Sequence, residues 1–375
     1  MKKLTGLILL SGSAISDTNI NYLSGFSAPD RFLFLQTDFE KYLVVSTMEK
    51  GRAQKQSKSG VNVLTPNELG LSPKKATQIE EQIIALLEKI NLKRIKVPSD
   101  FPVGIFQTLE KRGIQISVQK NEVCPERKVK SKPEISKIRL SQKAAVAAMN
   151  AAIEKISSSS VDLKGRLCSG EEILTSEKVR QIIHKTLMEY DCIGMDTIVA
   201  GGNQATDPHE QGFGPLFAGE SIIMDIFPKS GKTGYWGDLT RTVCYGKANP
   251  KLKKLYLAVK AAQQAALAMV KPGVCADEVH LAAVNVFKLR GYETKTVAGK
   301  NVGFIHGTGH GVGLDIHEFP RIGKSGEMLE EGNVITIEPG LYYPGLGGVR
   351  IEDTIVVTKT GWRYLATCPK FFEIL

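Results

Sequence analysis

The chain has 375 residues, of which 42% are hydrophobic and 23% are charged, and its formal net charge at neutral pH is +10. This composition is that of a globular protein and excludes a disordered or low-complexity chain, while the length favours two domains. No apolar run approaches the roughly 18–20 residues of a membrane-spanning helix, so we expect no membrane partner.

Cysteine usage and charge distribution narrow the class of protein further. Six cysteines are scattered without a Cys-x-x-Cys pair, which favours a reduced, cytoplasmic protein over a disulfide framework or a zinc knuckle. Residues 1–135 carry 21 lysines and arginines against 14 acidic residues, and the remainder carries 28 against 25. Because these basic residues are dispersed singly, they indicate a solvated surface, and we expect no nucleic-acid partner.

The first part of the chain alternates strand-like apolar runs with amphipathic segments. Residues 1–16 combine a basic end with a short apolar run, which is compatible with a signal peptide, but the pattern favours a first β-strand. Residues 32–46 indicate two strands, and residues 79–90 and 103–112 indicate helices. We therefore expect an α/β domain, which ends in the basic, proline-containing segment 124–136.

Beyond this boundary the elements come in blocks. Helical periodicity predicts four long helices, at residues 137–156, 174–190, 250–271 and 277–290. Strand-like runs lie between and after them, and the segment PKSGKTG is expected to be the turn of a hairpin. Such blocks predict an α+β domain with an antiparallel sheet. The predicted domains cover residues 1–130 and 131–375.

The stretch Gly303–Glu318 concentrates the histidines of the chain. It contains His306, His310 and His317 among five glycines, which let backbone and ligand approach closely. In an extended segment His306 and His310 would face the same side, because they are an even number of residues apart. His317 could join them only after a bend. The stretch alone is compatible with a metal or catalytic site.

Four carboxylates stand in apolar, strand-like runs: Asp225, Asp238, Glu338 and Glu352. A carboxylate in such a run is a poor strand former, and its burial is costly unless it is paired or bound to metal. Arg241 and Arg350 are candidate partners for a single buried acid. Four acids together with a three-histidine run are harder to explain by ion pairs, so we favour a metal site.

The charge of this set indicates the kind of metal site. Four carboxylates carry a charge of −4, which two divalent cations would balance. Bridging carboxylates hold such ions about 3.5–4 Å apart, an arrangement that activates a water and polarises a carbonyl or phosphoryl oxygen. A site of oxygen donors and one imidazole suits Mn²⁺, Fe²⁺ or Co²⁺, whereas thiolate-rich sites select zinc. We expect two divalent ions, with manganese preferred and cobalt, zinc or iron as alternatives.

The order Asp, Asp, His, Glu, Glu resembles the pita-bread metallopeptidases, and within them the Xaa-Pro branch of aminopeptidase P and prolidase. The matching stretches are NYLSGF, GGNQATDPH, MDIF with GYWGDLTRT, HGTGHGVGLDIHE, ITIEPGLY and GGVRIEDT. The resemblance covers most of the second domain and, more loosely, the first. It implies an α+β fold, in which a smaller α/β creatinase-like domain precedes a pita-bread catalytic domain whose antiparallel sheet is flanked by helices.

The resemblance implies a set of site residues. The five implied metal ligands are Asp225, Asp238, His310, Glu338 and Glu352. Asp238 and Glu352 would bridge the ions, and Glu338 would also be the general base and then acid. Three histidines would line the cleft, and two further residues would orient the first aspartate: His209, His306 and His317, and Arg350 with Tyr342. The two aspartates are thirteen residues apart, where the family usually has eleven.

The implied function is a dinuclear-metal exopeptidase acting on peptides that contain proline. We expect an Xaa-Pro aminopeptidase, because no spare cation is identifiable that would capture the carboxylate of a dipeptide. The alternative is an Xaa-Pro dipeptidase (prolidase), and a more remote one is a non-catalytic pita-bread protein that binds peptides, histones or nucleic acid. The family analogy also implies a homodimer. His184 and His280 match no site motif and are expected to be ordinary helix residues.

Overall fold

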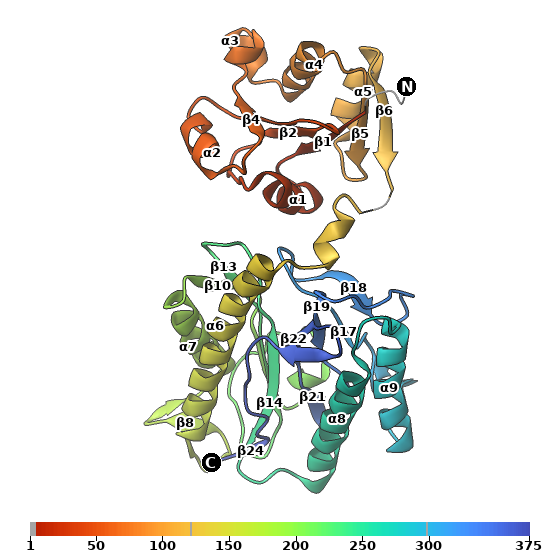
Figure 1. The fold of residues 1–375 in the computed structure, drawn as a ribbon. Coiled ribbons are helices and arrows are strands. Elements are labelled where there is room, and N and C mark those ends of the chain that lie inside the picture. Colours follow the sequence, from red (N-terminus) through yellow and green to blue (C-terminus); the bar gives the residue numbers. More distant parts are fainter. Residues whose placement is uncertain (1–4, 121, 298) are drawn as a thin grey trace. The chain divides into compact units, whose positions relative to one another are not determined.

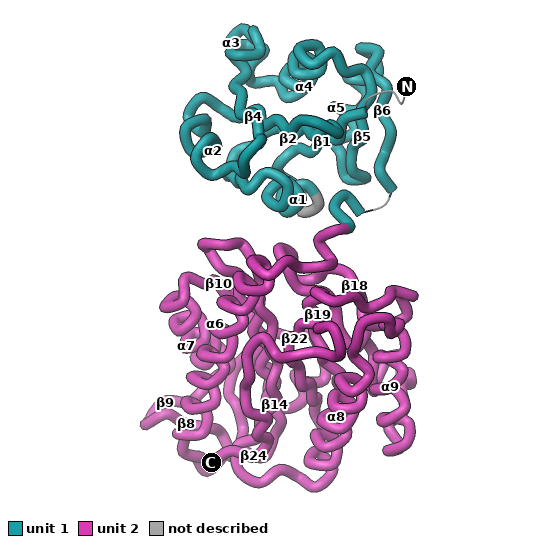
Figure 2. Tube along the Cα trace, in the orientation of Figure 1, with its two compact units in different colours: residues 1–125 teal, residues 126–375 magenta. Residues whose placement is uncertain are grey.

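A computed structural model describes residues 5–120, 122–297 and 299–375 of the chain. Contacts between Cα atoms divide it into two compact units, Met1–Pro125 and Glu126–Leu375 (Figure 2). Residues 1–4, the basic start of the stretch with the signal-peptide alternative, lie outside the described residues. The apolar run that follows them forms the strand Gly6–Leu10. No described helix combines the length and the apolar character that a bilayer crossing requires.

The first unit is built on a six-stranded mixed sheet of order β4-β3-β2-β1-β5-β6 (Figure 1). Its strands are β1 (Gly6–Leu10), β2 (Leu33–Gln36), β3 (Lys41–Val44), β4 (Val61–Leu64), β5 (Arg94–Pro98) and β6 (Gln115–Gln119). Its α-helices are α1 (Ala14–Ser24), α2 (Lys50–Gln56), α3 (Pro73–Ala76), α4 (Ile79–Lys89) and α5 (Val103–Lys111), with a short 3₁₀ turn at Asn67–Leu69. A second 3₁₀ turn, Pro125–Lys128, spans the boundary between the two units.

Alternating apolar residues give this sheet two covered faces. Ile8 packs in one core with residues of α4 and α5, whereas its neighbour Leu9 packs in another with α1 and α2. Successive side chains of a strand point to opposite faces, so continuous apolar strands require cover on both sides. The predicted α/β domain and its two expected helices are therefore confirmed.

The second unit is α+β, as predicted, and its long helices are α6 (Lys132–Ser157), α7 (Ser176–Met188), α8 (Pro250–Met269) and α9 (Ala276–Leu289). The helix α6 begins five residues earlier than the periodicity predicted. Glu134 accepts a hydrogen bond from the Ser131 backbone N–H, which caps the start of the helix. Pro133 is tolerated there because the first turn of a helix needs no backbone donor.

Two antiparallel sheets form the centre of the second unit. One has the order β11-β12-β14-β24, from β11 (Ile198–Gly201), β12 (Ile222–Ile226), β14 (Leu239–Tyr245) and β24 (Glu373–Ile374), with only the β14–β24 pair parallel. The other has the order β18-β17-β19-β22-β23, from β17 (Gly309–Gly311), β18 (Glu318–Ile322), β19 (Val334–Ile337), β22 (Asp353–Val357) and β23 (Trp362–Tyr364).

Smaller ladders complete the unit. They are β10 (Cys192–Gly194) with β13 (Pro228–Ser230), β20 (Gly340–Tyr343) with β21 (Gly347–Arg350), β15 (Lys295–Val297) with β16 (Lys300–Val302), and β7 (Ser160–Val161), β8 (Leu167–Ser169) and β9 (Glu172–Ile173), with a 3₁₀ turn at Gln204–Thr206. The predicted hairpin turn PKSGKTG is wrong in detail. β12 and β14 do pair, but the segment between them contains β13, which leaves to pair with β10.

The helices cover the two main sheets pairwise. Residues of α6 and α7 share a core with β12 and β14, and residues of α8 and α9 share one with β19 and β22 (Figure 1). On β12, Met224 and Ile226 face the α6–α7 core, so the strand alternation turns Asp225 to the opposite face. Asp225 therefore lies on the face of β12 that α6 and α7 leave free.

Candidate metal centre

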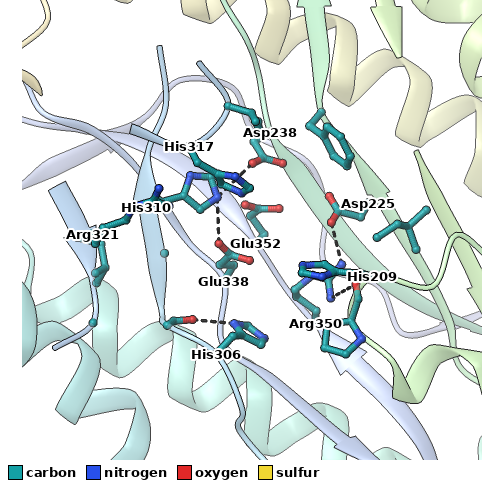
Figure 3. Close-up of a pocket in the computed structure, with 18 of the residues that line it drawn as sticks. His209, Asp225, Asp238, His306, His310, His317, Arg321, Glu338, Arg350 and Glu352 are labelled. Atoms are coloured by element: carbon teal, nitrogen blue, oxygen red, sulfur yellow. Dashed lines mark hydrogen bonds and ion pairs between the residues drawn. The ribbon is translucent and has the colours of Figure 1, made fainter. Parts of the chain in front are cut away.

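A cavity of about 800 Å³ in the second unit collects the predicted site residues (Figure 3). It is lined by Asp225, Asp238, His310, Glu338, Glu352, His209, His306, His317 and Arg350, among others. Tyr342, the remaining predicted residue, is fully buried and contacts two of them. Segments more than a hundred residues apart in sequence thus meet around one space.

The carboxylates lie at or just beyond strand ends. Asp225 is within β12, whereas Asp238 immediately precedes β14. Glu338 follows the last residue of β19, and Glu352 precedes the first residue of β22. The last ladder pair of these two strands is Ile337 with Asp353, so both glutamates stand one step past the ladder. Beyond this pair the two backbones bond to other segments, the Glu338 N–H to the Thr308 carbonyl oxygen and the Glu352 N–H to the Thr240 carbonyl oxygen.

Three of these residues can share one ion. Asp238, His310 and Glu352 each offer a ligand atom, and the three atoms all lie within 4.8 Å of one another. His310 Nε2 lies 3.2 Å from Glu338 Oε1 and 3.6 Å from Asp238 Oδ2. Its Nδ1 lies 3.1 Å from the Gly311 carbonyl oxygen, to which an Nδ1–H would donate. That tautomer leaves the Nε2 lone pair facing the carboxylates, as a metal ligand requires.

A tight backbone approach brings His310 into this position. A Cβ on Gly309 would lie 2.0 Å from the Thr336 carbonyl oxygen, far inside contact distance. Only glycine permits β17 to lie so close to β19 at this point. The glycines of the histidine-rich stretch thus have a structural reason to be there.

The raised pKa values and unpaired oxygens of the acids indicate that this cluster needs positive charge. Burial raises the pKa of Asp238 and of Glu352 well above their ordinary values, and the neighbouring carboxylates raise it further. Asp225 Oδ1 and Glu352 Oε1 are buried and have no hydrogen-bond partner among the residues that the structure describes. Buried carboxylates that repel one another and keep unpaired oxygens fit a cluster of divalent cations.

Glu338 differs from the other acids. Burial by itself would raise the pKa of its carboxyl group, but the hydrogen bond with the His310 imidazole and the nearby positive charge of Arg350 outweigh this and lower the pKa to about 2. A cation bound at the same place would favour the ionised form in the same way. Glu338 is therefore held as a carboxylate, which can accept a proton.

A buried chain of polar groups supports Asp225. Arg350 Nη2 lies 2.7 Å from Asp225 Oδ2, and Arg350 Nη1 donates to the Tyr342 hydroxyl at 2.8 Å. The Tyr342 hydroxyl lies 2.9 Å from His306 Nε2. Burial lowers the pKa of His306 to about 4, so this imidazole is neutral at neutral pH and its Nε2 accepts a hydrogen bond from the Tyr342 hydroxyl. Arg350 thus pairs with Asp225, one of the pairings considered from the sequence.

The remaining histidines lie around the cavity. The His317 ring meets the His310 ring edge to face at a centroid distance of 4.4 Å. Burial, His310 and Arg321 lower the pKa of His317 to about 4. His209 is exposed, and its backbone N–H donates to the Asp207 carboxylate. Both residues are therefore exposed parts of the cavity lining.

Sequence reasoning overlooked Arg321. It lines the cavity together with His317, and among the described residues its guanidinium forms no ion pair. His317, Phe319 and Arg321 are spaced by two in and before the strand β18, so they alternate with the buried residues Glu318, Pro320 and Ile322. This alternation is readable in the sequence and could have placed Arg321 beside His317.

The two histidines without a site motif have partners in the second unit. His184 Nε2 lies 3.1 Å from Thr197 Oγ1, and His280 Nδ1 lies 2.9 Å from Thr308 Oγ1. Neither histidine lines the cavity. Both sit within helices, α7 and α9, as expected.

Arg241 pairs with none of the four predicted acids but with Asp353, at 2.7 Å, and both side chains are almost fully buried. We expect Arg241→Met to lower the free energy of unfolding by about 3 kcal/mol, because it leaves Asp353 buried with only Lys370 as a charged partner. Denaturant unfolding would measure this loss. Lys178→Met, which breaks the exposed pair with Glu172, should leave the unfolding midpoint unchanged. Equal midpoints for the two variants would contradict a structural role for Arg241.

The chain matches known proteins over nearly its whole length. Residues 136–359 match the model of metallopeptidase family M24, and residues 2–140 match that of the creatinase/prolidase N-terminal domain. The Xaa-Pro dipeptidase of Pyrococcus horikoshii is 32% identical over 351 residues, which cover 92% of this chain and 90% of the relative.

Solved structures also match the chain over nearly its whole length. The prolidase from Pyrococcus furiosus is 27% identical and superposes with a TM-score of 0.79 over 97% of both chains. The X-Pro aminopeptidase from Thermotoga maritima is 22% identical, with a TM-score of 0.82 over 99% of this chain and 98% of that one. The second likeness shows the fold alone, so the fold does not distinguish the two activities.

Proposed function

Because this chain belongs to metallopeptidase family M24, we propose that it is an Xaa-Pro dipeptidase, which hydrolyses dipeptides whose second residue is proline. Membership of the family and the predicted fold, a pita-bread domain after a creatinase-like domain, are confirmed by the two family models and by the prolidase structure. The family also implies a hydrolase that uses divalent metal ions. The substrate, the ligand set and the identity of the ions are our proposals.

We propose that two divalent ions, preferably Mn²⁺, are held by the five residues Asp225, Asp238, His310, Glu338 and Glu352. The charge of four carboxylates, the unpaired oxygens of Asp225 and Glu352, and the shared position of Asp238, His310 and Glu352 support this set. When bound, such ions would activate a water and polarise the carbonyl of the peptide bond.

The side chains around this centre would move protons and hold the substrate. Glu338, ionised and at the edge of the cavity, would accept a proton from the attacking water and return it to the leaving proline nitrogen. His306 and His317 are neutral at neutral pH, because burial lowers the pKa of each to about 4. They would therefore bind the peptide group by hydrogen bonds, while His209 would contact it from the exposed rim.

Arg321 is the observation that carries the choice of a dipeptide. The sequence-based expectation of an aminopeptidase rests on the lack of an identifiable spare cation at the cleft. Arg321 supplies one, since it lines the cavity and forms no ion pair within the described residues. Its charge also acts at the site, where it helps to lower the pKa of His317. A guanidinium in this place can bind the carboxylate of a dipeptide, and the named relatives also favour the dipeptidase alternative.

The substrate panel that tests this proposal compares Xaa-Pro dipeptides, Xaa-Pro amides and Xaa-Pro-Yaa tripeptides. We expect the dipeptides to be cleaved best. Arg321→Met should lower kcat/KM for dipeptides by about 10–100-fold, because a hydrogen bond to a charged group contributes about 1.5–3 kcal/mol. The amide lacks the carboxylate, so the same substitution should leave its slower cleavage unchanged.

The control variant is Arg363→Met, which removes an exposed arginine on β23 outside the cavity. It should leave all three substrate classes unaffected. Cleavage of tripeptides with no cleavage of dipeptides would favour the aminopeptidase, and cleavage of an N-acetylated peptide would contradict both activities.

We further propose a reduced, cytoplasmic setting and a homodimer. All six cysteines are free in the structure, which supports the first. The second rests on the family analogy, and sedimentation of the purified chain would measure it.

A further inference from the structure

Two glutamines in the helices that cover the sheets contact the backbone of the site. Gln142 lies on α6 and Gln263 on α8, and both side chains are fully buried. We propose that they are positioning residues, which hold the backbone at Asp238, Glu338 and Glu352 so that these carboxylates meet at the metal centre. This inference rests on the proposed metal site.

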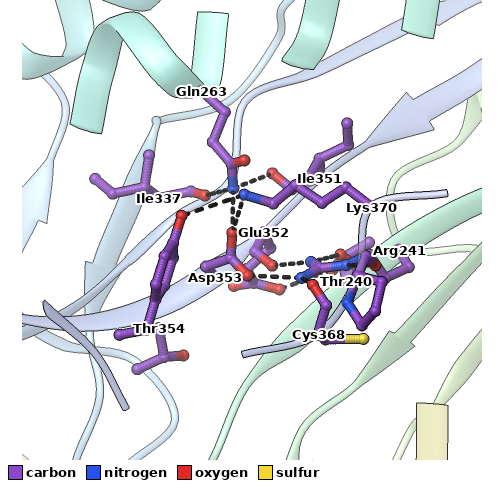
Figure 4. Close-up of polar contacts among 12 residues, drawn as sticks. Thr240, Arg241, Gln263, Ile337, Ile351, Glu352, Asp353, Thr354, Cys368 and Lys370 are labelled. Carbon is purple, nitrogen blue, oxygen red and sulfur yellow. Dashed lines mark hydrogen bonds and ion pairs between the residues drawn. The ribbon is translucent and has the colours of Figure 1, made fainter. Parts of the chain in front are cut away.

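Gln263 bonds to the peptide groups in front of both glutamates (Figure 4). Its Nε2 lies 2.9 Å from the Ile337 carbonyl oxygen and 3.2 Å from the Ile351 carbonyl oxygen. These carbonyls belong to the peptide groups that lead into Glu338 and Glu352, where the β19–β22 ladder has ended. One side-chain amide therefore bonds to the carbonyl group directly in front of each glutamate.

The same two peptide groups are also held at their N–H ends. The Glu338 N–H donates to the Thr308 carbonyl oxygen at 2.7 Å, and the Glu352 N–H donates to the Thr240 carbonyl oxygen at 3.1 Å. A planar peptide group that is bonded at both ends cannot rotate freely. The direction in which each glutamate leaves the backbone is then fixed.

Gln142 bonds to the backbone of Asp238 at both its N–H and its carbonyl group. Its Oε1 accepts from the Asp238 N–H at 2.8 Å, and its Nε2 donates to the Asp238 carbonyl oxygen at 2.8 Å. The β12–β14 ladder ends at Ile226 and Leu239, so Asp238 has no strand partner there. A Cβ on Gly237 would lie 2.6 Å from the Gln142 backbone nitrogen, which shows how closely the helix approaches.

A buried charge cluster orients Gln263. Asp353 Oδ2 lies 3.1 Å from Gln263 Nε2 and 2.6 Å from Lys370 Nζ, and its Oδ1 pairs with Arg241. With three acceptors around it, this terminal atom must be the amide nitrogen. Arg241 also donates to the Glu352 carbonyl oxygen (Figure 4). The carbonyl groups before and after the Cα atom of Glu352 are therefore both held by hydrogen bonds.

The other end of the Gln263 amide argues against a purely structural role. Its Oε1 is buried and has no hydrogen-bond partner among the described residues. A buried acceptor without a partner is unfavourable, and an apolar residue would avoid it. The amide of Gln263 therefore acts through its N–H donors, which bond to groups next to the site.

The test measures Mn²⁺ binding rather than peptide hydrolysis. The full-length chain, stripped of metal, is titrated with Mn²⁺ by calorimetry, for the wild type and for Gln142→Met and Gln263→Met. Methionine keeps the side-chain length but removes the amide. Because partners that orient metal ligands typically contribute about 10–100-fold to metal affinity, we expect the Kd for Mn²⁺ to rise by about that factor in each variant.

The matched control is Val259→Ala, on the same helix one turn before Gln263 and fully buried. It should lower the Tm of the metal-free chain but leave the Kd for Mn²⁺ within about twofold of the wild type. If a methionine variant does not fold, Gln→Asn at the same position is measured instead, since its amide is one methylene too short to reach. An unchanged Kd in either glutamine variant, with only the Tm lowered, would overturn the assignment for that residue.

The outcome is separable from the proposed substrate. If the chain bound Mn²⁺ but cleaved no Xaa-Pro dipeptide, the proposed function would fail while the positioning role could still be measured. If the wild-type chain bound no Mn²⁺, both would fail.

Discussion

Replacement of Glu338 by glutamine is expected to lower kcat by about 10²–10⁴-fold, the usual contribution of a general acid–base group. Glutamine keeps the size of the side chain and one oxygen donor but cannot accept the proton of the attacking water. Glu338 is suited to that step because its pKa is lowered to about 2, so it is ionised at neutral pH. The measurement is kcat on an Xaa-Pro dipeptide at saturating Mn²⁺, with circular dichroism as the check on folding.

Two histidine variants provide the comparison for Glu338→Gln. His317→Ala should also lower kcat, because His317 lines the cavity and its ring contacts that of His310. His184→Ala removes the same type of side chain from α7, where it bonds to Thr197 outside the cavity, and should leave kcat unchanged. Equal damage from His184→Ala and His317→Ala, or wild-type kcat in Glu338→Gln, would show that the residue roles are wrong.

Removal of divalent ions by a chelator is expected to abolish hydrolysis, and Mn²⁺ or Co²⁺ should restore it. The reason is that the ions would activate a water and that four neighbouring carboxylates are unstable together without positive charge. At a free Mn²⁺ concentration 100–1,000 times the Kd, binding should stabilise the fold by about 2.7–4.1 kcal/mol. Full activity in a preparation that elemental analysis shows to be free of transition metals would contradict the proposal.

The pH dependence of the metal-free chain has a definite sign. Burial and mutual repulsion raise the pKa of Asp238 and Glu352 in the folded state, so at these two carboxyl groups the folded chain binds more protons than the unfolded chain once the pH exceeds about 4. Burial lowers the pKa of His306 and His317 to about 4, so these imidazoles bind more protons in the unfolded chain and oppose the trend up to their ordinary pKa of about 6.5. Metal-free stability should therefore fall as the pH rises from that value toward the raised pKa values. Mn²⁺ competes with these protons, so the stabilisation it gives should grow over the same range, and thermal unfolding with and without Mn²⁺ would measure both trends.

Local patterns predicted the elements and the chemistry of the site. The helices of α4, α5 and α7 to α9 follow from apolar periodicity, because each must bury one face. Asp225, Asp238, Glu338 and Glu352 were recognisable because a charge in an apolar run is anomalous wherever that run folds. The histidine-rich stretch was recognisable from composition. The resemblance then implied the pairing of these segments, and all the implied residues except Tyr342 line one cavity, which Tyr342 adjoins.

Contacts between distant segments decided the rest. From the sequence, Arg241 and Arg350 were equal candidates to pair with a buried acid, and only the packing of β14 against the start of β22 assigned Arg241 to Asp353. Gln142 and Gln263 look like ordinary polar positions of amphipathic helices, because helical periodicity records burial but not which backbone groups lie opposite. Their partners are 74 to 96 residues away, where strand ladders end.

The sequence by itself therefore determined which elements form, which acids and histidines are candidates for the site, and that buried acids need positive charge. These are properties of single segments, set by the cost of burying a charge and by the period of a helix or strand. Only the tertiary structure decided that Arg321 forms no ion pair within the described part of the chain, and that two helices hold the backbone of three carboxylates. Hydrogen bonds and ion pairs between distant segments depend on where strand ladders end and on how closely helices approach the sheets. Neither of these two features produces a periodic pattern of residues in the sequence.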